Sequence, residues 1–309
     1  MFRLILLLCC LLFVFTGEAA NPEPGLYWKK TGENSYRLSY SGTKWAGIRW
    51  QLRLQPGTSY RISCEAQSSV TIPPSFAVSV EQKSIEAQAH SQFLVGRNWT
   101  PCVLYFYCRQ PDVICRFQAI GKLSAELQLR NLQIVPLADQ DFADNLLPDG
   151  NFEAGDPMPP FWRNAWQAVK YRWRTVTNSD FFAGTRNLEI SFVPRQVEAS
   201  GLRSWMLPVR PGHEYECRFW AKTDEKEYTI CAQLQIWAQF GPHVGKHYYV
   251  MRSFKLSQEW QECTVNMVIP EEDGSIPDLR DRVVNLQFSG DPERAGRVRI
   301  SEISFQEIR

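Results

Sequence analysis

The strongest constraint on the fold is an internal repeat, because the two halves of the chain carry the same three segments in the same order. In the first half these are 46-AGIRWQLRLQPGTSYRISCEAQ-67, 98-NWTPCVLYF-106 and 121-GKLSAELQLRNLQIVPL-137, and in the second half 200-SGLRSWMLPVRPGHEYECRFWAKT-223, 259-EWQECTVNMV-268 and 296-GRVRISEISFQEI-308. Aligning the Pro-Gly turns places Tyr60 on Tyr215. A match over so long a period, in only two copies, predicts tandem domains rather than a solenoid.

Each copy consists of short stretches in which apolar and polar residues alternate, separated by Gly, Pro, Asn and Asp. This pattern is typical of antiparallel strands. The chain is therefore predicted to be all-β, with two tandem antiparallel β-sandwich domains of the jelly-roll kind. A polar stretch separates the copies, so the predicted domains span 21–137 and 145–309, with a linker at 138–144.

The first 20 residues have the layout of a secretory signal peptide. Arg3 supplies a positive start, 4-LILLLCCLLFVF-15 is an apolar run too short to span a bilayer, and cleavage is expected after Ala19 or Ala20. No other segment is apolar enough to cross a membrane, so we expect a secreted, periplasmic or extracellular protein without membrane insertion. The formal net charge of +1 gives no reason to expect a nucleic-acid partner.

Seven of the nine cysteines follow the signal peptide. Alternation places most of them on apolar strand faces, and an exported chain favours disulfides. The expected pairs are Cys64–Cys102, Cys217–Cys263 and Cys108–Cys115, which leaves Cys231 unpaired. The alternative is that all seven are buried thiols, since cysteine is a common core residue.

The stretch 233-QLQIWAQF-240 has an unusual polar side. With a period of two, one side is apolar and the other carries Gln233, Gln235, Trp237 and Gln239. Two further segments alternate in the same way: 216-ECRFWAK-222 turns Glu216, Arg218 and Trp220 away from the core, and 283-VVNLQF-288 does so with Asn285 and Gln287. The chain also holds 11 Trp, 11 Tyr and 18 Phe, so some aromatic side chains are expected to contact a ligand.

The second half resembles the carbohydrate-binding modules of families four, nine and twenty-two. The resemblance rests on the order and spacing of 145-NLLPDGNFEAG-155, Trp162, 184-GTRNLEISF-192, 211-PGHEYECRFWAK-222, Trp260 and 298-VRISEISFQEI-308. The first half matches more loosely over 24–137. The resemblance implies jelly rolls that bind glycans along one sheet, without catalysis and without an obligatory cofactor.

A sugar ring has an apolar face and an equator of hydroxyls, so its partner needs aromatic planes with neutral donors and acceptors beside them. If the three segments share a sheet, Trp220 and Trp237 form a platform for a poly- or oligosaccharide. The polar residues around it are Arg218, Gln233, Gln235, Asn285 and Gln287. Packing between the domains, or no role at all, remains an alternative for this face. The counterpart in the first half, 76-FAVSVEQK-83, has no outward aromatic, so that copy is expected to lack such a site.

The resemblance also implies a structural calcium ion in the second domain. Glu153 and Glu302 are the candidate ligands, although family members typically carry an Asp pair near Glu302. His243 and His247 are four residues apart, but no third zinc ligand is evident.

Two other function classes stay open. In one, the protein is a jelly-roll lyase or hydrolase that uses Arg218, Tyr248 and Glu216. In the other, it is a structural or adhesive protein whose aromatic patch binds a protein partner.

Overall fold

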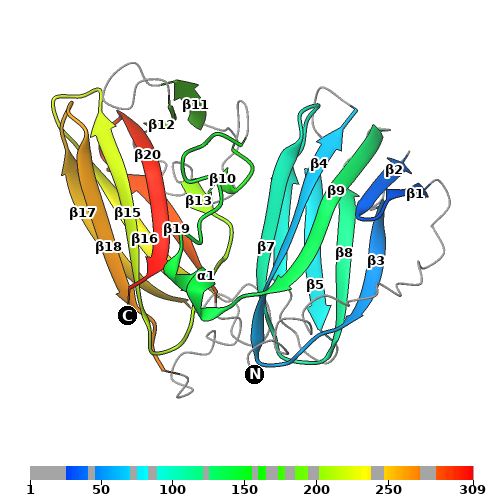
Figure 1. Ribbon diagram of the computed structural model, residues 1–309. Helices are drawn as coiled ribbons and strands as arrows, with labels where there is room; N and C mark the ends of the chain where they lie inside the picture. Colours follow the sequence, from blue (N-terminus) through cyan, green and yellow to red (C-terminus); the bar gives the residue numbers. More distant parts are fainter. Residues whose placement is uncertain are drawn as a thin grey trace, which may run out of the picture.

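The chain folds into two β-sandwiches that lie side by side (Figure 1). The computed structural model describes residues 26–40, 46–69, 75–82, 89–120, 125–154, 159–164, 173–177, 185–193, 202–237, 247–271 and 283–308. All strand pairs in these ranges are antiparallel, which confirms the predicted all-β class of two tandem jelly-roll sandwiches. The predicted signal peptide lies outside the described residues.

In the described ranges, the first sandwich has nine strands in two sheets. They are β1 (Leu26–Gly32), β2 (Ser35–Tyr40), β3 (Ala46–Arg53), β4 (Thr58–Ser68), β5 (Ser75–Gln82), β6 (Ala89–Leu94), β7 (Thr100–Cys108), β8 (Asp112–Ile120) and β9 (Ala125–Pro136). One sheet has the order β1-β2-β9-β4-β7 and the other the order β3-β8-β5-β6.

The second sandwich follows α1 (Asp139–Ala143). Its strands are β10 (Trp162–Asn164), β11 (Trp173–Thr177), β12 (Arg186–Phe192), β13 (Leu202–Ser204), β14 (Leu207–Pro208), β15 (Glu214–Thr223), β16 (Tyr228–Trp237), β17 (His247–Leu256), β18 (Gln261–Val268), β19 (Val283–Gly290) and β20 (Gly296–Glu307). One sheet has the order β10-β13-β19-β16-β17, with β14 beside β19, and the other the order β11-β12-β20-β15-β18. No helix of the described chain has the length and apolar character that a membrane span requires.

The sequence repeat is a structural repeat, because each Pro-Gly turn leads into the same tyrosine contact. The Tyr60 hydroxyl accepts a hydrogen bond from the backbone N–H of Gln55 at 3.0 Å, and the Tyr215 hydroxyl accepts one from the N–H of Arg210 at 2.8 Å. Each of these tyrosines lies five residues after its donor. The alignment of Tyr60 on Tyr215 therefore holds at the level of individual atoms.

Backbone irregularities repeat at matching places. The turn glycines Gly57 and Gly212 have φ angles of 82° and 76°, which favour glycine because a Cβ would be strained there. The register shifts once between β4 and β9 and once between β15 and β20. Asn131 and Glu302 lie at these two bulges, with φ angles of 53° and 50°. The two sandwiches thus share turns and bulges as well as strand order.

The predicted disulfides are not formed, since the structure holds all seven described cysteines as thiols. Cys64 and Cys102 face each other across β4 and β7, as predicted, but remain separate. Burial raises the pKa of the Cys102 thiol well above its usual value, so this thiol stays protonated. Cys108 and Cys115 lie in different sheets, so the connection between them is not a hairpin.

The predicted Cys217–Cys263 disulfide is not formed for a different reason, which is the register of the two strands. Cys217 faces Val265, and Cys263 faces Phe219, so the two cysteines are not cross-strand partners. All four side chains are buried and belong to the apolar core.

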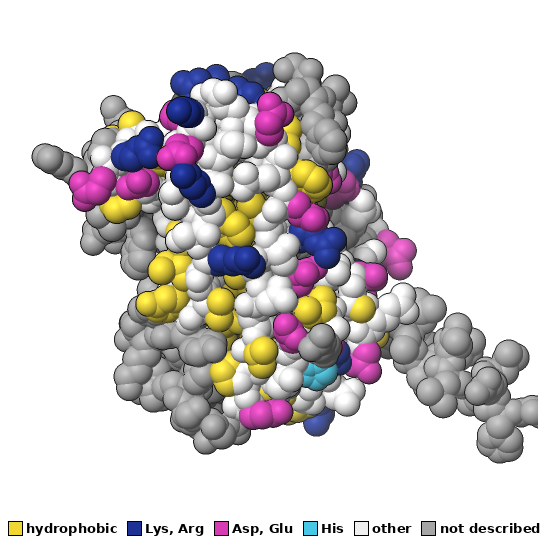
Figure 2. Space-filling view, turned by 90° about the vertical axis from the view of Figure 1, so that its left-hand side faces the viewer, with side chains coloured by type: hydrophobic (Ala, Val, Ile, Leu, Met, Phe, Trp, Pro, Cys, Tyr) yellow, Lys and Arg dark blue, Asp and Glu magenta, His cyan; other side chains and the backbone are white. Residues whose placement is uncertain are grey.

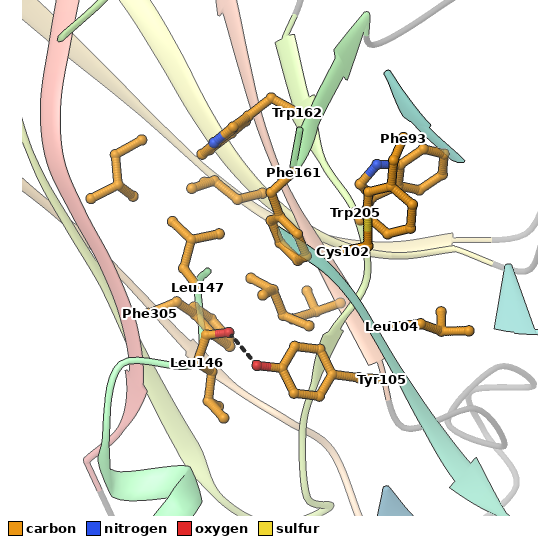
Figure 3. Close-up of a cluster of buried hydrophobic side chains, with 14 of the residues drawn as sticks. Phe93, Cys102, Leu104, Tyr105, Leu146, Leu147, Phe161, Trp162, Trp205 and Phe305 are labelled. Carbon is orange, nitrogen blue, oxygen red and sulfur yellow. Dashed lines mark hydrogen bonds between the residues drawn. The ribbon is translucent and has the colours of Figure 1, made fainter. Parts of the chain in front are cut away.

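Apolar packing joins the two sandwiches (Figure 3). The Tyr105 hydroxyl of β7 donates a hydrogen bond to the backbone oxygen of Leu146 at 3.0 Å. The rings of Phe93 from β6 and Trp205 lie with their centroids 6.3 Å apart, and both side chains are almost fully buried. The edge of the first sandwich formed by β6 and β7 is therefore the side that meets the second sandwich.

Candidate functional site

Four primary amides form a compact block on the sheet β10-β13-β19-β16-β17. Gln233 faces Gln287 and Gln235 faces Asn285 across β16 and β19. The residues between them on both strands, such as Leu234 and Leu286, are buried in the core. Since side chains alternate along a strand, the four amides share the outer face of the sheet. The sequence prediction that these four residues lie together is confirmed.

Three of these amides are buried, and two of the three have polar atoms without a hydrogen-bond partner. Gln235 is 4% exposed, Gln287 is 7% exposed and Asn285 is 0% exposed. Among the described residues, neither Oδ1 nor Nδ2 of Asn285 has a hydrogen-bond partner, and Oε1 of Gln287 has none either. A buried amide left without a partner costs about 1–3 kcal/mol, so Asn285 and Gln287 hold buried polar atoms that lack a complement.

Exposed side chains of the edge strand β17 flank the block. Tyr249 faces Gln235 and Met251 faces Gln233, and these two β17 side chains are 47% and 57% exposed. Figure 2 shows this side of the molecule, where apolar side chains gather between charged ones. Trp237 pairs through its backbone at the end of β16, while its side chain lies outside the described part of the structure. An aromatic ring therefore lies next to the amides, as sugar stacking requires, although it is Tyr249 that supplies it.

Three further residues on this face were not predicted from the sequence. Arg203 of β13 faces Gln287 of β19, Arg163 of β10 faces Arg203, and Trp205 follows on the same face. The Arg163 guanidinium lies 4.0 Å from the centre of the Trp205 ring. The signal was present in 202-LRSW-205, where Leu202 alternates with Arg203, but β10 and β13 are too short to show a pattern by themselves.

The prediction that Arg218 and Trp220 share this face is wrong. Both residues lie on β15, which belongs to the opposite sheet, β11-β12-β20-β15-β18. The alternation of apolar and polar residues correctly predicted that both side chains point away from the core. It does not indicate which of the two sheets a strand joins. Arg218 instead forms ion pairs with Glu216 at 2.7 Å and Glu262 at 3.5 Å on its own sheet.

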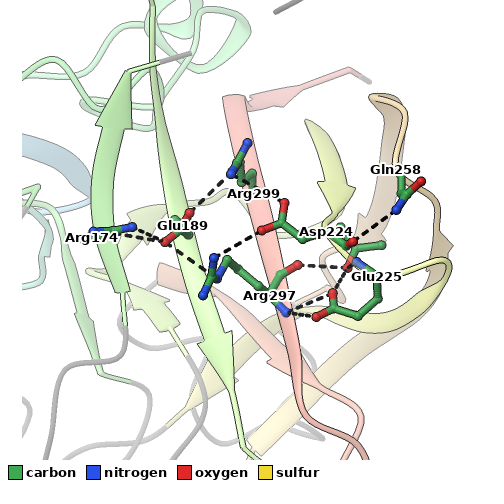
Figure 4. A network of polar contacts seen from close by, with 8 residues as sticks. Arg174, Glu189, Asp224, Glu225, Gln258, Arg297 and Arg299 are labelled. Atoms are coloured by element: carbon green, nitrogen blue, oxygen red, sulfur yellow. Dashed lines mark hydrogen bonds and ion pairs between the residues drawn. The ribbon is translucent and has the colours of Figure 1, made fainter. Parts of the chain in front are cut away.

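The outer face of that opposite sheet carries a network of ion pairs (Figure 4). Glu189 lies 2.9 Å from Arg174 and 3.5 Å from Arg299, and Asp224 lies 3.5 Å from both Arg297 and Arg299. The charged groups of this face thus form ion pairs with one another. By contrast, the amides of Asn285 and Gln287 on β19 have atoms without a partner in the described chain.

The three residues of the enzyme alternative do not assemble. Arg218 and Glu216 pair with each other on β15, whereas Tyr248 lies on β17 of the opposite sheet. Tyr248 pairs through its backbone with Ile236, and its side chain lies outside the described part of the structure. A groove that would bring this Arg, Tyr and carboxylate to one reacting bond is therefore not formed by these residues.

The structural calcium ion implied by the resemblance stays a prediction. Glu153 and Glu302 are both exposed, and no group of three or more His, Cys, Asp or Glu occurs in the part of the chain that the structure describes. His243 and the side chain of His247 lie outside the described residues.

The corresponding face of the first sandwich has a different composition. On β5 and β8, Ala77 faces Gln118 and Ser79 faces Arg116. Arg116 also forms an ion pair with Glu81 at 2.7 Å. This face thus carries an ion pair and small, buried side chains in place of an amide block.

Similar solved structures include carbohydrate-binding modules. The tandem CBM22-1–CBM22-2 domains of Xyn10C from Paenibacillus barcinonensis are 14% identical, with 95% of both chains covered and a TM-score of 0.41. TmCBM61, solved in complex with β-1,4-galactotriose, is 16% identical over 53% of this chain and 99% of its own, with a TM-score of 0.34. The enzymatically active domain of tailspike protein 4 from bacteriophage CBA120 is 17% identical over 53% of this chain and 21% of its own, with a TM-score of 0.37.

Carbohydrate-binding modules, which the sequence led us to expect, are thus among the solved structures that the chain resembles. At this level of similarity it assigns neither a function nor a binding residue to this chain. No protein-family model and no curated protein matches the sequence.

Proposed function

We propose that the protein is a secreted, non-catalytic carbohydrate-binding protein. Its glycan site is the outer face of β16 and β19, where Gln233, Gln235, Asn285 and Gln287 bind hydroxyls and Tyr249 stacks on a sugar ring. Trp237, at the end of β16, extends the stacking surface. Secretion follows from the signal peptide expected in residues 1–20.

The observation that carries the proposal is the paired amide block with unused hydrogen-bonding groups. Amides donate to and accept from hydroxyls without the large desolvation penalty of a buried charge. The two unpaired atoms of Asn285 and the unpaired Oε1 of Gln287 match a ligand that offers both donors and acceptors. A sugar hydroxyl does both at once, whereas an apolar peptide segment would leave these atoms unpaired.

The site belongs to the second of two domains, 145–309, joined by residues 138–144 to a first domain, 21–137. In our proposal the first domain has no equivalent glycan site, because its outer face carries the Arg116–Glu81 ion pair and no amide block. Its contribution is to pack against the second domain through Tyr105 and Phe93.

A glycan and polysaccharide screen on the mature protein tests the proposal. We expect weak binding, in a range of about 1 mM to 1 μM, that is lost in Tyr249→Ala and Gln235→Leu. Gln118→Leu, on the corresponding face of the first sandwich, is the matched control and leaves binding unchanged. Failure to bind any glycan, with a folded protein, rejects the proposal, and product release from the bound polysaccharide rejects its non-catalytic part.

A second candidate function is the binding of a protein partner. It is favoured by Met251 on β17 and Val268 on β18, each 57% exposed, on two edge strands that contact each other. Single exposed apolar residues are common, but two on adjacent edges form a surface that a partner strand can cover. Met251→Lys separates the two functions, since it abolishes a protein interface and leaves the amides of β19 in place.

A further inference from the structure

The amide block continues into a pair of positive charges along one row of the sheet. Successive cross-strand partners in this row are Arg163, Arg203, Gln287 and Gln233, from β10, β13, β19 and β16. Directly opposed residues share a face, so two guanidinium groups lie beside the two glutamine amides. The row thus changes from neutral to cationic towards β10.

Two like charges on directly opposed residues destabilise a sheet unless something compensates them. Desolvation, followed by the charge of neighbouring Arg203, lowers the pKa of the Arg163 guanidinium, which still remains protonated at neutral pH. Neither Nε nor Nη2 of Arg163 has a hydrogen-bond partner, and within the described chain its guanidinium contacts the Trp205 ring instead of a carboxylate. His90 adds no compensating negative charge, because burial, followed by the charge of Arg163, lowers its pKa and favours the neutral imidazole.

On the opposite sheet, arginines form ion pairs with carboxylates of the same chain. There, Arg174, Arg297 and Arg299 each lie within 4 Å of a carboxylate of Glu189 or Asp224. Arg116 in the first sandwich is likewise paired with Glu81. Arg163 departs from this pattern on the face where Asn285, fully buried, has both of its amide atoms unpaired.

We infer that the glycan is acidic, with its carboxylate or sulfate ester bound by Arg163 next to the amide block. The inference rests on the proposed function, and it adds the chemical class of the ligand. A planar guanidinium with free N–H groups binds a carboxylate or sulfate through charge-assisted hydrogen bonds, which are about twice as strong as neutral ones. The amides then contact hydroxyls of the same or the next sugar unit.

The experiment compares acidic polysaccharides with their neutral forms on the full mature protein. Galacturonan, glucuronoxylan and alginate are each tested beside the carboxyl-reduced polysaccharide, and carrageenan is included as a sulfate ester. At least one acidic polymer is expected to bind roughly tenfold tighter than its neutral form, equivalent to about 1.4 kcal/mol, with an advantage that shrinks as salt is added. Arg163→Gln removes this advantage, whereas Arg49→Gln, an exposed arginine of β3, retains it.

The outcomes separate the two proposals. Equal or tighter binding of the carboxyl-reduced forms, without binding of carrageenan, overturns the acidic ligand and leaves the proposed function standing. An acidic advantage that survives in Arg163→Gln also overturns the role of this residue. Binding of no polysaccharide at all rejects the proposed function and the inference with it. Unfolding of Arg163→Gln by heat is compared with the wild type, and Arg163→Lys, which keeps the charge, is used if the Gln variant does not fold.

Discussion

The two sandwiches share a tyrosine contact and differ in what surrounds it. Tyr60 and Tyr215 both accept a hydrogen bond from the backbone five residues earlier. On the neighbouring strand, however, Tyr60 faces Pro136 while Tyr215 faces Glu307. Because proline offers no side-chain acceptor, the first sandwich has a single hydrogen bond where the second has a network.

In that network Glu307 contacts several donors. Tyr215 donates to Oε2 at 2.9 Å, the Nε of Arg210 donates to the same oxygen at 2.8 Å, and His213 lies 2.9 Å from Oε1. Burial alone would raise the pKa of Glu307, but the hydrogen bonds from Arg210 and Tyr215 outweigh it and hold the pKa below its usual value. The comparison teaches that backbone geometry was kept in both copies, while polar contacts were added in one.

The largest expected effect concerns the backbone hydrogen bond that each sandwich makes next to its β-bulge. The N–H of Leu132 donates to the backbone oxygen of Asn34 at 3.4 Å, and the N–H of Ile303 donates to that of Gly150 at 2.9 Å. A Cβ added to Gly150 would lie 1.9 Å from the Ile303 oxygen, so the backbone would have to move. We expect Gly150→Ala to lower the free energy of unfolding by about 3 kcal/mol, measured by chemical denaturation.

Asn34→Ala is the matched change in the first sandwich. It removes only a side chain, and the contact uses the backbone, so a loss below about 1 kcal/mol is expected. Equal losses for the two variants would show that the bulges are not covered in corresponding ways.

The tyrosine contacts give the next largest effect. Tyr215→Phe leaves the Arg210 N–H without its acceptor and removes one donor from Glu307, so a loss of about 2 kcal/mol is expected. Tyr60→Phe frees only the N–H of Gln55, an exposed residue that water reaches, and a loss of about 1 kcal/mol or less is expected. Denaturation of both variants under identical conditions provides the test, and a larger loss for Tyr60→Phe would reverse the comparison.

The outer faces of the two sandwiches give a third contrast, between paired and unpaired polar groups. Asn285→Leu removes an amide whose two polar atoms lack partners, so we expect the free energy of unfolding to rise by about 1 kcal/mol while glycan binding is lost. Gln118→Leu in the first sandwich should change neither quantity appreciably. A lower free energy of unfolding for Asn285→Leu than for the wild type would mean that the amide supports the fold. It would contradict the assignment of this face as a binding site.

Much of the fold was predictable because it depends on local pattern. Alternation identified the inward and outward residues of β15, β16 and β19, and the repeated Pro-Gly-x-x-Tyr motif located Tyr60 and Tyr215 in equivalent turns. These features depend on the chain near each residue. The cysteine pairing was not predictable, because Cys217 and Cys263 miss each other by a difference in register that no local pattern contains.

The candidate site was predictable only in part for a related reason. The four amides lie on two long strands, and their period of two is visible in the sequence. Assigning Arg218 and Trp220 to the same face required knowing which sheet β15 joins, and that is decided by long-range packing. Arg163 was missed because β10 is only three residues long. Its place beside Arg203 follows from the pairing of β10 with β13, which the sequence does not show.

The smallest expected effect concerns the junction between the sandwiches, where the first supplies His90 and the second supplies Trp205. Their rings meet edge-on with centroids 6.4 Å apart, and burial, followed by the positive charge of Arg163, lowers the pKa of His90 below 6.5. Above pH 6.5 the imidazole is neutral in both the folded and the unfolded chain. As the pH falls below 6.5, the unfolded chain takes up the proton first, so the free energy of unfolding decreases until the pH reaches the folded-state pKa.

His90→Gln removes this contribution, because an amide does not titrate in this range. We therefore expect the midpoint of thermal unfolding to fall less in the variant than in the wild type between about pH 7.5 and about pH 5.5. His213 lies beside Glu307 and away from the junction, so its contribution is common to both proteins. Identical pH dependence in the two proteins would mean that His90 is accessible to water, and that the sandwiches are not packed against each other in solution as they are in the structure.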